Sequence, residues 1–361
     1  MFSTSSRPPH KHSHTKTGAE VPAHHSEHAS PGISGSAPEN VADSVPPGVT
    51  LGLALGGGAA RGFAHIGILV VLERHGIRPH LVAGSSIGAI VGGLWAAGKM
   101  DALNDWALNL SRSNMLGFLD FTLNGGGLIA GRRLKARMRQ EVGHMALEDL
   151  PTPFIAVATE CNTGREIWLN RGDFVSALRA SYALPGLFTP VQLGELWLMD
   201  GALVNPVPVT PVRASGADFI IAVDLNGDAF APMPPLQDHG GACPDTTPED
   251  GRNGSQNPLD LLNPARLRRQ FLPTENKEPG FSLPAVITDA LNITQDRVTR
   301  ARLAEDPPEI LITPALRDVG LFDFHRARDI IDIGIAAGEA ALPDIRAALQ
   351  AAADKKEPAG S

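Results

Sequence analysis

The sequence has few cysteines, few aromatic residues and no excess of positive charge, and each scarcity excludes a class of protein. Its 361 residues include two cysteines, Cys161 and Cys243, too few for a disulfide framework or a four-cysteine zinc site. Aromatic residues make up 5% of the chain, which leaves little for stacking nucleic-acid bases. The 31 Lys and Arg are outnumbered by 39 Asp and Glu, whereas a nucleic-acid binder usually has a basic excess. We therefore expect no nucleic-acid partner and no resident metal.

Long hydrophobic runs are also scarce. The N-terminus, MFSTSSRPPHKHSHTK, lacks the apolar core of a secretory signal. The uncharged stretch 81–98 is long enough to look marginally membrane-spanning, but it contains five glycines and follows Pro79. We expect this stretch to form a buried strand, a turn and a helix. The absence of a signal and the few cysteines predict a cytoplasmic protein.

Composition divides the chain into a polar tail, one folded domain and a short C-terminal end. Residues 1–47 are rich in Ser, Pro, Gly and His, so we expect a disordered tail. His-rich tracts can bind metal, but a solvated tail is the favoured interpretation. The 43% of hydrophobic residues suffice for one large domain, placed at 48–345 with a Pro- and Gly-rich excursion at 229–281. Residues 346–361 are expected to be a helix end and a polar tail.

Short apolar runs alternate with segments of helical periodicity. Runs that fit strands are 49–55, 81–83, 154–158, 219–224 and 310–312, and 191–193 with 196–199 fits a hairpin. Helical spacing predicts helices at 63–76, 87–95, 132–142, 173–182 and 326–352. Strands that alternate with helices predict an α/β domain, with a mostly parallel central sheet covered on both faces.

A glycine–serine motif follows the second predicted strand. Gly84-Ser85-Ser86-Ile87-Gly88 has the G-x-S-x-G spacing and stands before an amphipathic helix. Gly84 and Gly88 allow a sharp turn that projects the Ser86 hydroxyl at the helix N-terminus, where the helix dipole favours negative charge. The motif indicates a nucleophilic serine or, alternatively, a Gly/Ser helix start that only packs closely on a strand.

A glycine cluster follows the first predicted strand. Gly56-Gly57-Gly58-Ala59-Ala60-Arg61-Gly62 can bring backbone amides close to an anion, which serves phosphate binding or an oxyanion hole. The dinucleotide fingerprint fails because Arg61 stands where its third glycine belongs, and no Walker lysine follows. An oxyanion hole paired with Ser86 is the better interpretation, and no cofactor is expected.

A serine nucleophile needs a base. His239 lies in the excursion, His325 precedes a helix and His65 lies along one, and none has a convincing setting. Asp200 ends a strand at the Asp200-Gly201-Ala202 turn, and the strand ends of an α/β sheet converge on one edge. Asp200 can therefore accept the Ser86 proton directly, although Asp-Gly turns are commonly structural only.

Taken in order, these blocks resemble those of bacterial patatin-like phospholipases, in the branch related to the esterase domain of neuropathy target esterase. Arg179-Ala180-Ser181 with Pro185-Gly186, and Asn205-Pro206-Val207-Pro208, also match the family. The resemblance covers about 49–224, with a weaker stretch at about 286–340. It implies a three-layer α/β/α patatin-like sandwich and a serine acyl hydrolase with a Ser-Asp dyad.

The resemblance also implies roles for single residues. Ser86 attacks the ester carbonyl, Asp200 acts as general base, and water hydrolyses the acyl-enzyme in a second step. Amides of Gly57, Gly58 and their neighbours stabilise the oxyanion, while Arg61 either lends charge or ties the structure. Ala202 stands where many family members have glycine. The implied substrate is an acyl-ester lipid: a phospholipid, a lysophospholipid or a simpler ester.

A lipid substrate implies contact with a membrane surface. Residues 261–272 combine leucines and a phenylalanine with Arg266, Arg268 and Arg269. Such a segment rests on an anionic bilayer or packs against the domain, and we favour packing. We thus expect any membrane contact to be peripheral, at the inner face. The competing hypothesis is a non-catalytic member that binds lipid or protein, and the intact dyad and glycine loop favour the enzyme.

Overall fold

The computed structural model describes residues 44–109, 127–129, 131–228 and 283–356. The expected tail at 1–47 and the expected excursion at 229–281 fall almost wholly outside these ranges, as does the basic segment 261–272. Within them, eight strands form the main sheet in the order β10-β9-β1-β2-β4-β8-β7, and β5 pairs with β4.

The centre of the sheet is parallel, as predicted. Its strands are β1 (Leu51–Leu55), β2 (Leu81–Ser85), β4 (Phe154–Glu160), β9 (Phe219–Val223) and β10 (Ile310–Ile312). Every residue of β1, β2, β4 and β9 is buried, because helices cover both faces.

The far edge of the sheet is antiparallel. It contains β5 (Glu166–Leu169), β7 (Val191–Leu193) and β8 (Leu196–Asp200), and the hairpin predicted around Gly194 joins β7 to β8. A separate parallel pair is formed by β3 (Gly127–Ile129) and β6 (Gly186–Phe188). The antiparallel pairing of β8 with β4 brings its end, Asp200, opposite Ala158.

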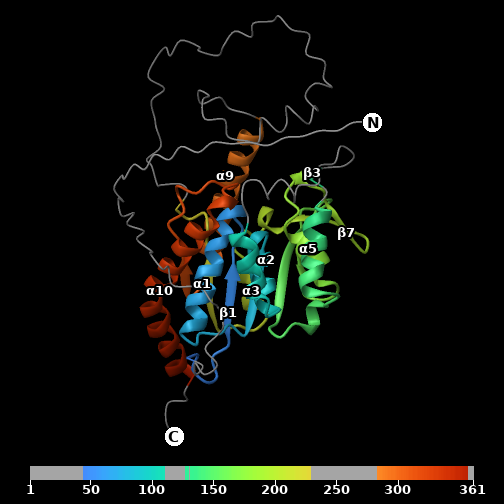
Figure 1. Cartoon of the computed structure of the whole chain (residues 1–361). Helices are drawn as coiled ribbons and strands as arrows, with labels where there is room; N and C mark the ends of the chain where they lie inside the picture. Colours follow the sequence, from blue (N-terminus) through green and yellow to red (C-terminus); the bar gives the residue numbers. More distant parts are fainter. Residues whose placement is uncertain (1–43, 110–126, 130, 229–282, 357–361) are drawn as a thin grey trace, which may run out of the picture. The chain divides into compact units, whose positions relative to one another are not determined.

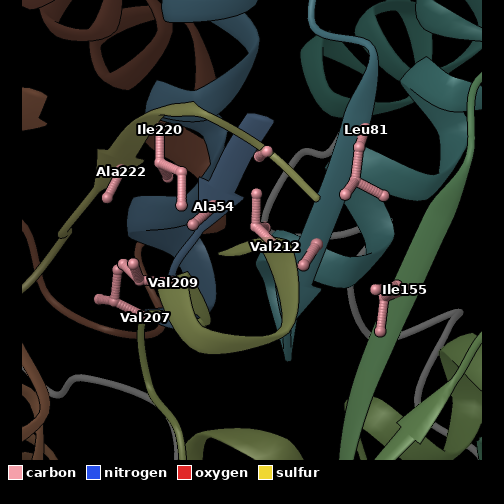
Figure 2. Packing of buried hydrophobic residues seen from close by; sticks show 10 residues of the cluster. Ala54, Leu81, Ile155, Val207, Val209, Val212, Ile220 and Ala222 are labelled. Atoms are coloured by element: carbon pink, nitrogen blue, oxygen red, sulfur yellow. The ribbon is translucent and has the colours of Figure 1, made fainter. Parts of the chain in front are cut away.

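One face of the sheet is covered by α7 (Val209–Ala214), which contacts β1, β2 and β9. Figure 2 shows Val212 of α7 in a buried cluster with Ala54, Ile155 and Ile220, each from a different strand. The approach is close because β1 has a glycine here: a Cβ on Gly52 would lie 2.1 Å from Val212 Cγ1.

The opposite face carries α1 (Phe63–Arg74), α2 (Ile87–Ala96), α6 (Phe174–Ser181) and α10 (Ala327–Lys356). Leu55 and Val82 point to α2, since a Cβ on Gly92 would lie 3.0 Å from each side chain. Side chains alternate along a strand, so this face is the one turned away from α7. In Figure 1, α1 and α10 lie side by side, in agreement with their contacts. The three-layer α/β/α arrangement is confirmed.

Several elements differ from the sequence prediction. Helices α3 (Met100–Leu108), α7 and α9 (Leu283–Glu305) and strand β5 were not predicted, while α5 (Arg132–Val142) has the predicted bounds. Helix α10 runs to Lys356 rather than ending near residue 352. The apolar stretch 81–98 folds as β2, a turn and α2, as predicted. Among the described residues, no helix is both long and apolar enough to cross a bilayer.

Candidate active site

Ser86 lies in the tight turn between β2 and α2. Its backbone has φ 56° and ψ −122°, a conformation that L residues rarely adopt and that costs about 1–3 kcal/mol. The turn also requires glycine at position 88, where a Cβ would lie 2.1 Å from the Leu55 carbonyl oxygen. The strand–turn–helix setting expected from the motif is therefore present, with Ser86 at the N-terminus of α2.

The Ser86 hydroxyl meets the carboxylate of Asp200. Ser86 Oγ donates a hydrogen bond of 2.6 Å to Asp200 Oδ2, across 114 positions of sequence. The other carboxylate oxygen, Oδ1, accepts the N–H of Ala202 at 2.8 Å. Thr159 Oγ1 donates to the Asp200 main-chain oxygen at 2.7 Å. Asp200 is thus held at the end of β8 with one oxygen directed at Ser86.

Asp200 is a buried acid. Only 1% of its surface is exposed, and burial raises the pKa of its carboxyl to about 6, against the lowering effect of the bonds from Ser86 and Ala202. A carboxylate with a pKa near neutrality is a stronger base than an ordinary one and is still ionised above pH 6. The arrangement can therefore take a proton from Ser86 without a histidine.

The glycine loop uses several of its amides for other bonds. The N–H of Gly56 donates to Val223 at 3.0 Å, that of Gly57 to Pro206 at 2.9 Å, and that of Arg61 to Gly58 at 3.1 Å. The expectation that Gly56, Gly57, Gly58, Arg61 and Gly62 form an oxyanion hole stays a prediction, although the N–H groups of Gly56, Gly57 and Arg61 already have acceptors. Within the part of the chain that the structure describes, the N–H groups of Gly58, Ala59 and Ile87 have no acceptor.

The predicted glycine, serine and Asp-Gly blocks converge around Gly57. A Cβ on Gly57 would lie 2.9 Å from Ala202 Cβ and 3.4 Å from Ser86 Cβ. The other motif glycines also pack closely: Gly62 on Ile87, Gly84 on Gly88, and Gly201 on Val157 of β4. All of the predicted site residues are thus brought into one region, although only some of them face the cavity.

Buried side chains hold the glycine loop from behind. His65 is fully buried, which lowers its pKa to about 4, so the neutral ring donates from Nε2 to the Gly56 carbonyl at 2.8 Å. Asn226 Nδ2 donates to the Gly57 carbonyl at 3.3 Å, and Arg61 Nη1 donates to Asn226 Oδ1 at 2.9 Å. Of the two roles considered for Arg61, these contacts favour the structural tie.

Ser181 supports the nucleophile turn itself. The N–H of Ser86 donates to Ser181 Oγ at 3.1 Å. Nearby, the Arg179 guanidinium lies 5.2 Å and 5.3 Å from the ring centres of Tyr182 and Phe188 and donates to the Thr189 carbonyl at 2.9 Å. The Arg179-Ala180-Ser181 block thus places the Ser181 hydroxyl on the Ser86 amide and the Arg179 guanidinium against two aromatic rings.

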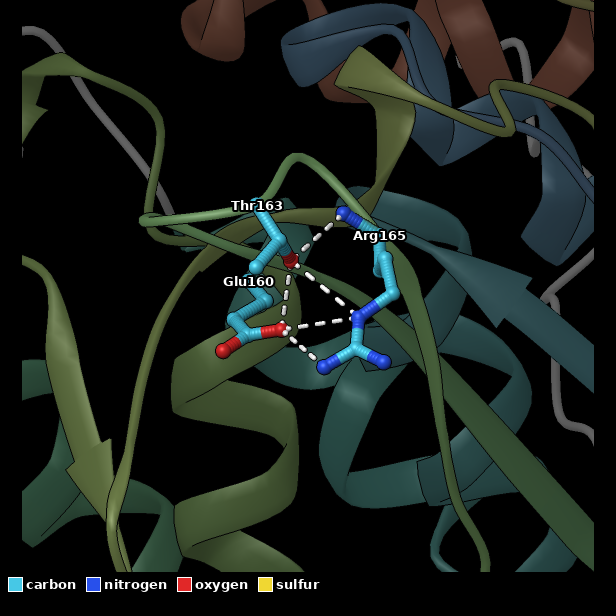
Figure 3. Close-up of polar contacts among 3 residues, drawn as sticks. All are labelled: Glu160, Thr163 and Arg165. Carbon is cyan, nitrogen blue, oxygen red and sulfur yellow. Dashed lines mark hydrogen bonds and ion pairs between the residues drawn. The ribbon is translucent and has the colours of Figure 1, made fainter.

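Other ionisable groups do not join the dyad. His325 lies in a short 3-10 helix (Phe324–Arg326) and is exposed, and His239 lies outside the described residues. Figure 3 shows Glu160, at the end of β4, engaged by the Thr163 hydroxyl at 2.5 Å and by Arg165, contacts that lower its pKa. Glu160 therefore ties the turn between β4 and β5. Among the described residues, no cluster of three His, Cys, Asp or Glu is placed to hold a metal ion.

The dyad opens into a cavity of about 130 Å³. Most of its described lining is aliphatic or aromatic, and it comes from α2, α3, α5, the end of α6, β6, α9 and the segment before α10: Ile87, Ile90, Trp106, Leu134, Tyr182, Leu184, Leu187, Phe188, Leu291, Leu321, Phe322 and Phe324. An apolar cavity beside a serine that is hydrogen-bonded to a carboxylate has room for an apolar chain such as the acyl part of an ester.

Comparisons with known proteins identify the family. A family model described as patatin-like phospholipase matches residues 53–213. An NTE family protein of Mycobacterium bovis, itself named as uncharacterized, is 31% identical over 325 residues, covering 80% of this chain and 90% of that protein. The chain therefore belongs to the patatin-like phospholipases and, within them, to the NTE family, as the sequence motifs predicted.

Other similar proteins carry activity names. Lysophospholipase NTE1 of Scheffersomyces stipitis and Neuropathy target esterase sws of Drosophila melanogaster are each 32% identical, over 192 and 186 residues. The matches cover 51% and 49% of this chain but 12% and 13% of those proteins. Among solved structures, VipD from Legionella pneumophila is similar with a TM-score of 0.36 and 12% identity, covering 81% of this chain and 67% of that one.

Proposed function

We propose that the protein is a serine acyl-ester hydrolase in which Ser86 is the nucleophile and Asp200 the general base. The observation that carries the proposal is the 2.6 Å hydrogen bond from Ser86 Oγ to Asp200 Oδ2 at the base of an apolar cavity. Membership of the patatin-like phospholipases supports a lipid ester as the substrate. We infer that the enzyme works in the cytoplasm, with peripheral contact to the inner membrane face.

The reaction follows from these positions. Ser86 Oγ attacks the ester carbonyl carbon while its proton passes to Asp200 Oδ2. The tetrahedral intermediate then collapses, the bond to the alcohol breaks, and Asp200 returns the proton to the leaving oxygen. Asp200 then takes a proton from water, which attacks the acyl-enzyme; the bond between the acyl carbon and Ser86 Oγ breaks, Asp200 returns the proton to Ser86 Oγ, and the carboxylic acid leaves.

The oxyanion needs preorganised N–H donors close to Ser86. Gly58, Ala59 and Ile87 line the cavity with Ser86, and their amides are the free ones. We infer that these amides form the oxyanion hole, with Ile87 at the N-terminus of α2, where the helix dipole adds to the effect. His65 and Asn226 act on it only indirectly, by holding the carbonyls of the loop.

A non-catalytic lipid- or protein-binding member of the same family is the second candidate. A binding protein has no need for a serine at φ 56° or for a carboxyl whose burial raises its pKa to about 6. Perturbed backbone and pKa at one point are typical of catalytic sites. The strain of the Ser86 backbone and the burial of the Asp200 carboxyl both lower stability, and only an enzyme has a use for them.

The test combines covalent labelling with turnover. A fluorophosphonate probe should label the wild type, which should also hydrolyse a short p-nitrophenyl ester. Both signals should vanish in Ser86→Ala and fall strongly in Asp200→Asn. Ser215→Ala is the matched control, because its hydroxyl only bonds the Pro211 carbonyl within α7 and its cap. Labelling that survives Ser86→Ala would refute the assignment of Ser86 as the nucleophile. A folded wild type that is not labelled and does not hydrolyse the ester would favour the binding protein.

A further inference from the structure

One wall of the cavity is polar. It is formed by Asn292 and Gln295 of α9, which are three residues apart and therefore lie on the same face of the helix. Both residues are half-buried, whereas Ile293 and Thr294 between them are exposed. Helix α9 thus turns these two carboxamides toward the space that contains Ser86 and Asp200.

The two carboxamides are available to a ligand. Among the described residues, neither side chain has a hydrogen-bond partner, although each offers two N–H donors and a carbonyl acceptor. Their polar atoms are not among the fully buried ones without a partner, so they stay in reach of solvent, and a ligand hydroxyl that bonds them takes the place of water.

The helix that carries these carboxamides is anchored beyond them. Arg302 of α9 donates to Glu166 Oε2 at 3.0 Å, and Glu166 Oε1 also accepts from Asn205 Nδ2 at 2.8 Å. Asn205 follows the Asp-Gly turn by a few residues, and its carbonyl accepts Ser85 Oγ at 2.6 Å. The polar wall is therefore connected to the segments that position the dyad, which reduces the ordering cost of binding.

The charge of the cavity distinguishes between ligands. Asp200 is the one side chain of the described lining that is charged at neutral pH, and its charge is negative. A phosphate is normally bound by Arg or Lys, and here its charge would lie near a carboxylate. A hydroxyl group both donates and accepts, so it matches a carboxamide without any need for a cation.

We propose that Asn292 and Gln295 bind hydroxyl groups of the leaving alcohol, and that the preferred substrates are acyl esters of a neutral polyol, such as a monoacylglycerol. This inference rests on the proposed function of Ser86 and Asp200. The acyl chain occupies the apolar lining, and the polyol lies against α9. When the acyl C–O bond breaks, the polyol oxygen takes its proton from Asp200 and the polyol leaves neutral.

The experiment uses the full chain and three esters of one acyl chain: monodecanoylglycerol, decanoyl lysophosphatidylcholine and methyl decanoate. The variants are Asn292→Leu and Gln295→Leu, which keep the approximate size of the side chain, do not lower helix propensity and remove the hydrogen-bonding groups. Thr294→Val is the matched control, because Thr294 is exposed and its hydroxyl bonds the Ala290 carbonyl of its own helix. The wild type should show its highest kcat/KM on the glycerol ester. Each Leu variant should lower that value about three- to tenfold, the worth of one hydrogen bond, and change methyl decanoate less than twofold.

Different outcomes separate this inference from the proposed function. Preference of the wild type for the lysophospholipid, or equal losses on all three esters in the Leu variants, would overturn the polyol site while fluorophosphonate labelling of Ser86 upheld the hydrolase. Absence of both labelling and hydrolysis of every ester would overturn the two together. An unchanged kcat/KM for monodecanoylglycerol in both Leu variants would also overturn the polyol site.

Discussion

Burial of Asp200 should make the protein less stable while it makes the acid a better base. Its pKa rises from 3.8 to about 6, a difference of about two units or roughly 3 kcal/mol. Because the folded pKa lies above the unfolded one, the contribution to stability is greatest below pH 3.8 and is lost as pH rises through 6. Above pH 6 the folded protein carries an unfavourable buried charge.

Asp200→Asn removes that charge with almost no change in volume. The Asn carbonyl can still accept the Ala202 N–H, and its amide can donate to Ser86 Oγ in place of the bond that Asp200 accepts. We therefore expect the variant to be nearly inactive and yet more stable than the wild type at pH 8, by about 1–3 kcal/mol. At pH 5 the gain should fall to about half, because the folded carboxyl is then mostly protonated while the unfolded one is still ionised, and it should vanish only below pH 3.8.

The assay is urea unfolding followed by circular dichroism at pH 5, 6.5 and 8. Asp332→Asn is the matched control, since Asp332 lies exposed on α10 and is not part of the site. Its free energy of unfolding should track that of the wild type at all three pH values. A gain in Asp200→Asn that did not depend on pH, or a loss at pH 8, would refute burial of the charge as the cause.

The remaining predictions concern the same site. The kcat/KM of a neutral ester should rise with pH through an apparent pKa of about 6, and a profile flat from pH 5 to 8 would exclude Asp200 as the base. The free energy of unfolding of Ser86→Gly should exceed that of Ser86→Ala by about 1 kcal/mol or more in urea titrations, because only glycine adopts φ 56° without strain. His65 has a folded pKa of about 4, below its unfolded 6.5, so its contribution to stability is present above pH 6.5 and is lost as pH falls through 4. His65→Gln, which can still donate to the Gly56 carbonyl, should therefore lose less stability between pH 6.5 and 4 in urea titrations. Asn226→Leu should lower kcat for short esters about tenfold with little change in KM, because it releases the Gly57 carbonyl; equal effects on both constants would contradict a positioning role.

Local sequence patterns predict the strands of the sheet and the two turns that carry Ser86 and Asp200, because each of these depends on neighbours in the chain. The runs at 51–55 and 219–223 are short, apolar and bounded by polar or glycine residues, which leaves a buried strand as the simplest interpretation. Asp200 was predicted because a strand end followed by glycine must present its side chain at the sheet edge. Helix α9 was missed because residues that it buries, such as Asp296 and Thr299, are polar while Ile293 is exposed, so no apolar periodicity marks the helix.

The backbone amides proposed as oxyanion donors could not be predicted in the same way. Whether the Gly57 amide is free depends on Pro206, and whether the loop is held depends on Asn226, and both lie about 150 or more positions further along the chain. His65 looks like any residue within an apolar helix until its ring is found against the Gly56 carbonyl. The contact of Asn226 with the loop arises from the packing of β9 beside β1, which no local pattern specifies.

The site violates local preferences at two adjacent points. Ser86 has a backbone that favours glycine, and Asp200 is an ionisable group almost without exposure. Neither would persist unless neighbours restrained it, and both are restrained: Ser181 binds the Ser86 amide, and Thr159 and Ala202 bind Asp200. Since each conformation is costly alone and the two meet in one hydrogen bond, chance accumulation of unrelated defects is a poor explanation. The economical one is that the surrounding fold holds a serine and a carboxylate in the geometry that proton transfer between them requires.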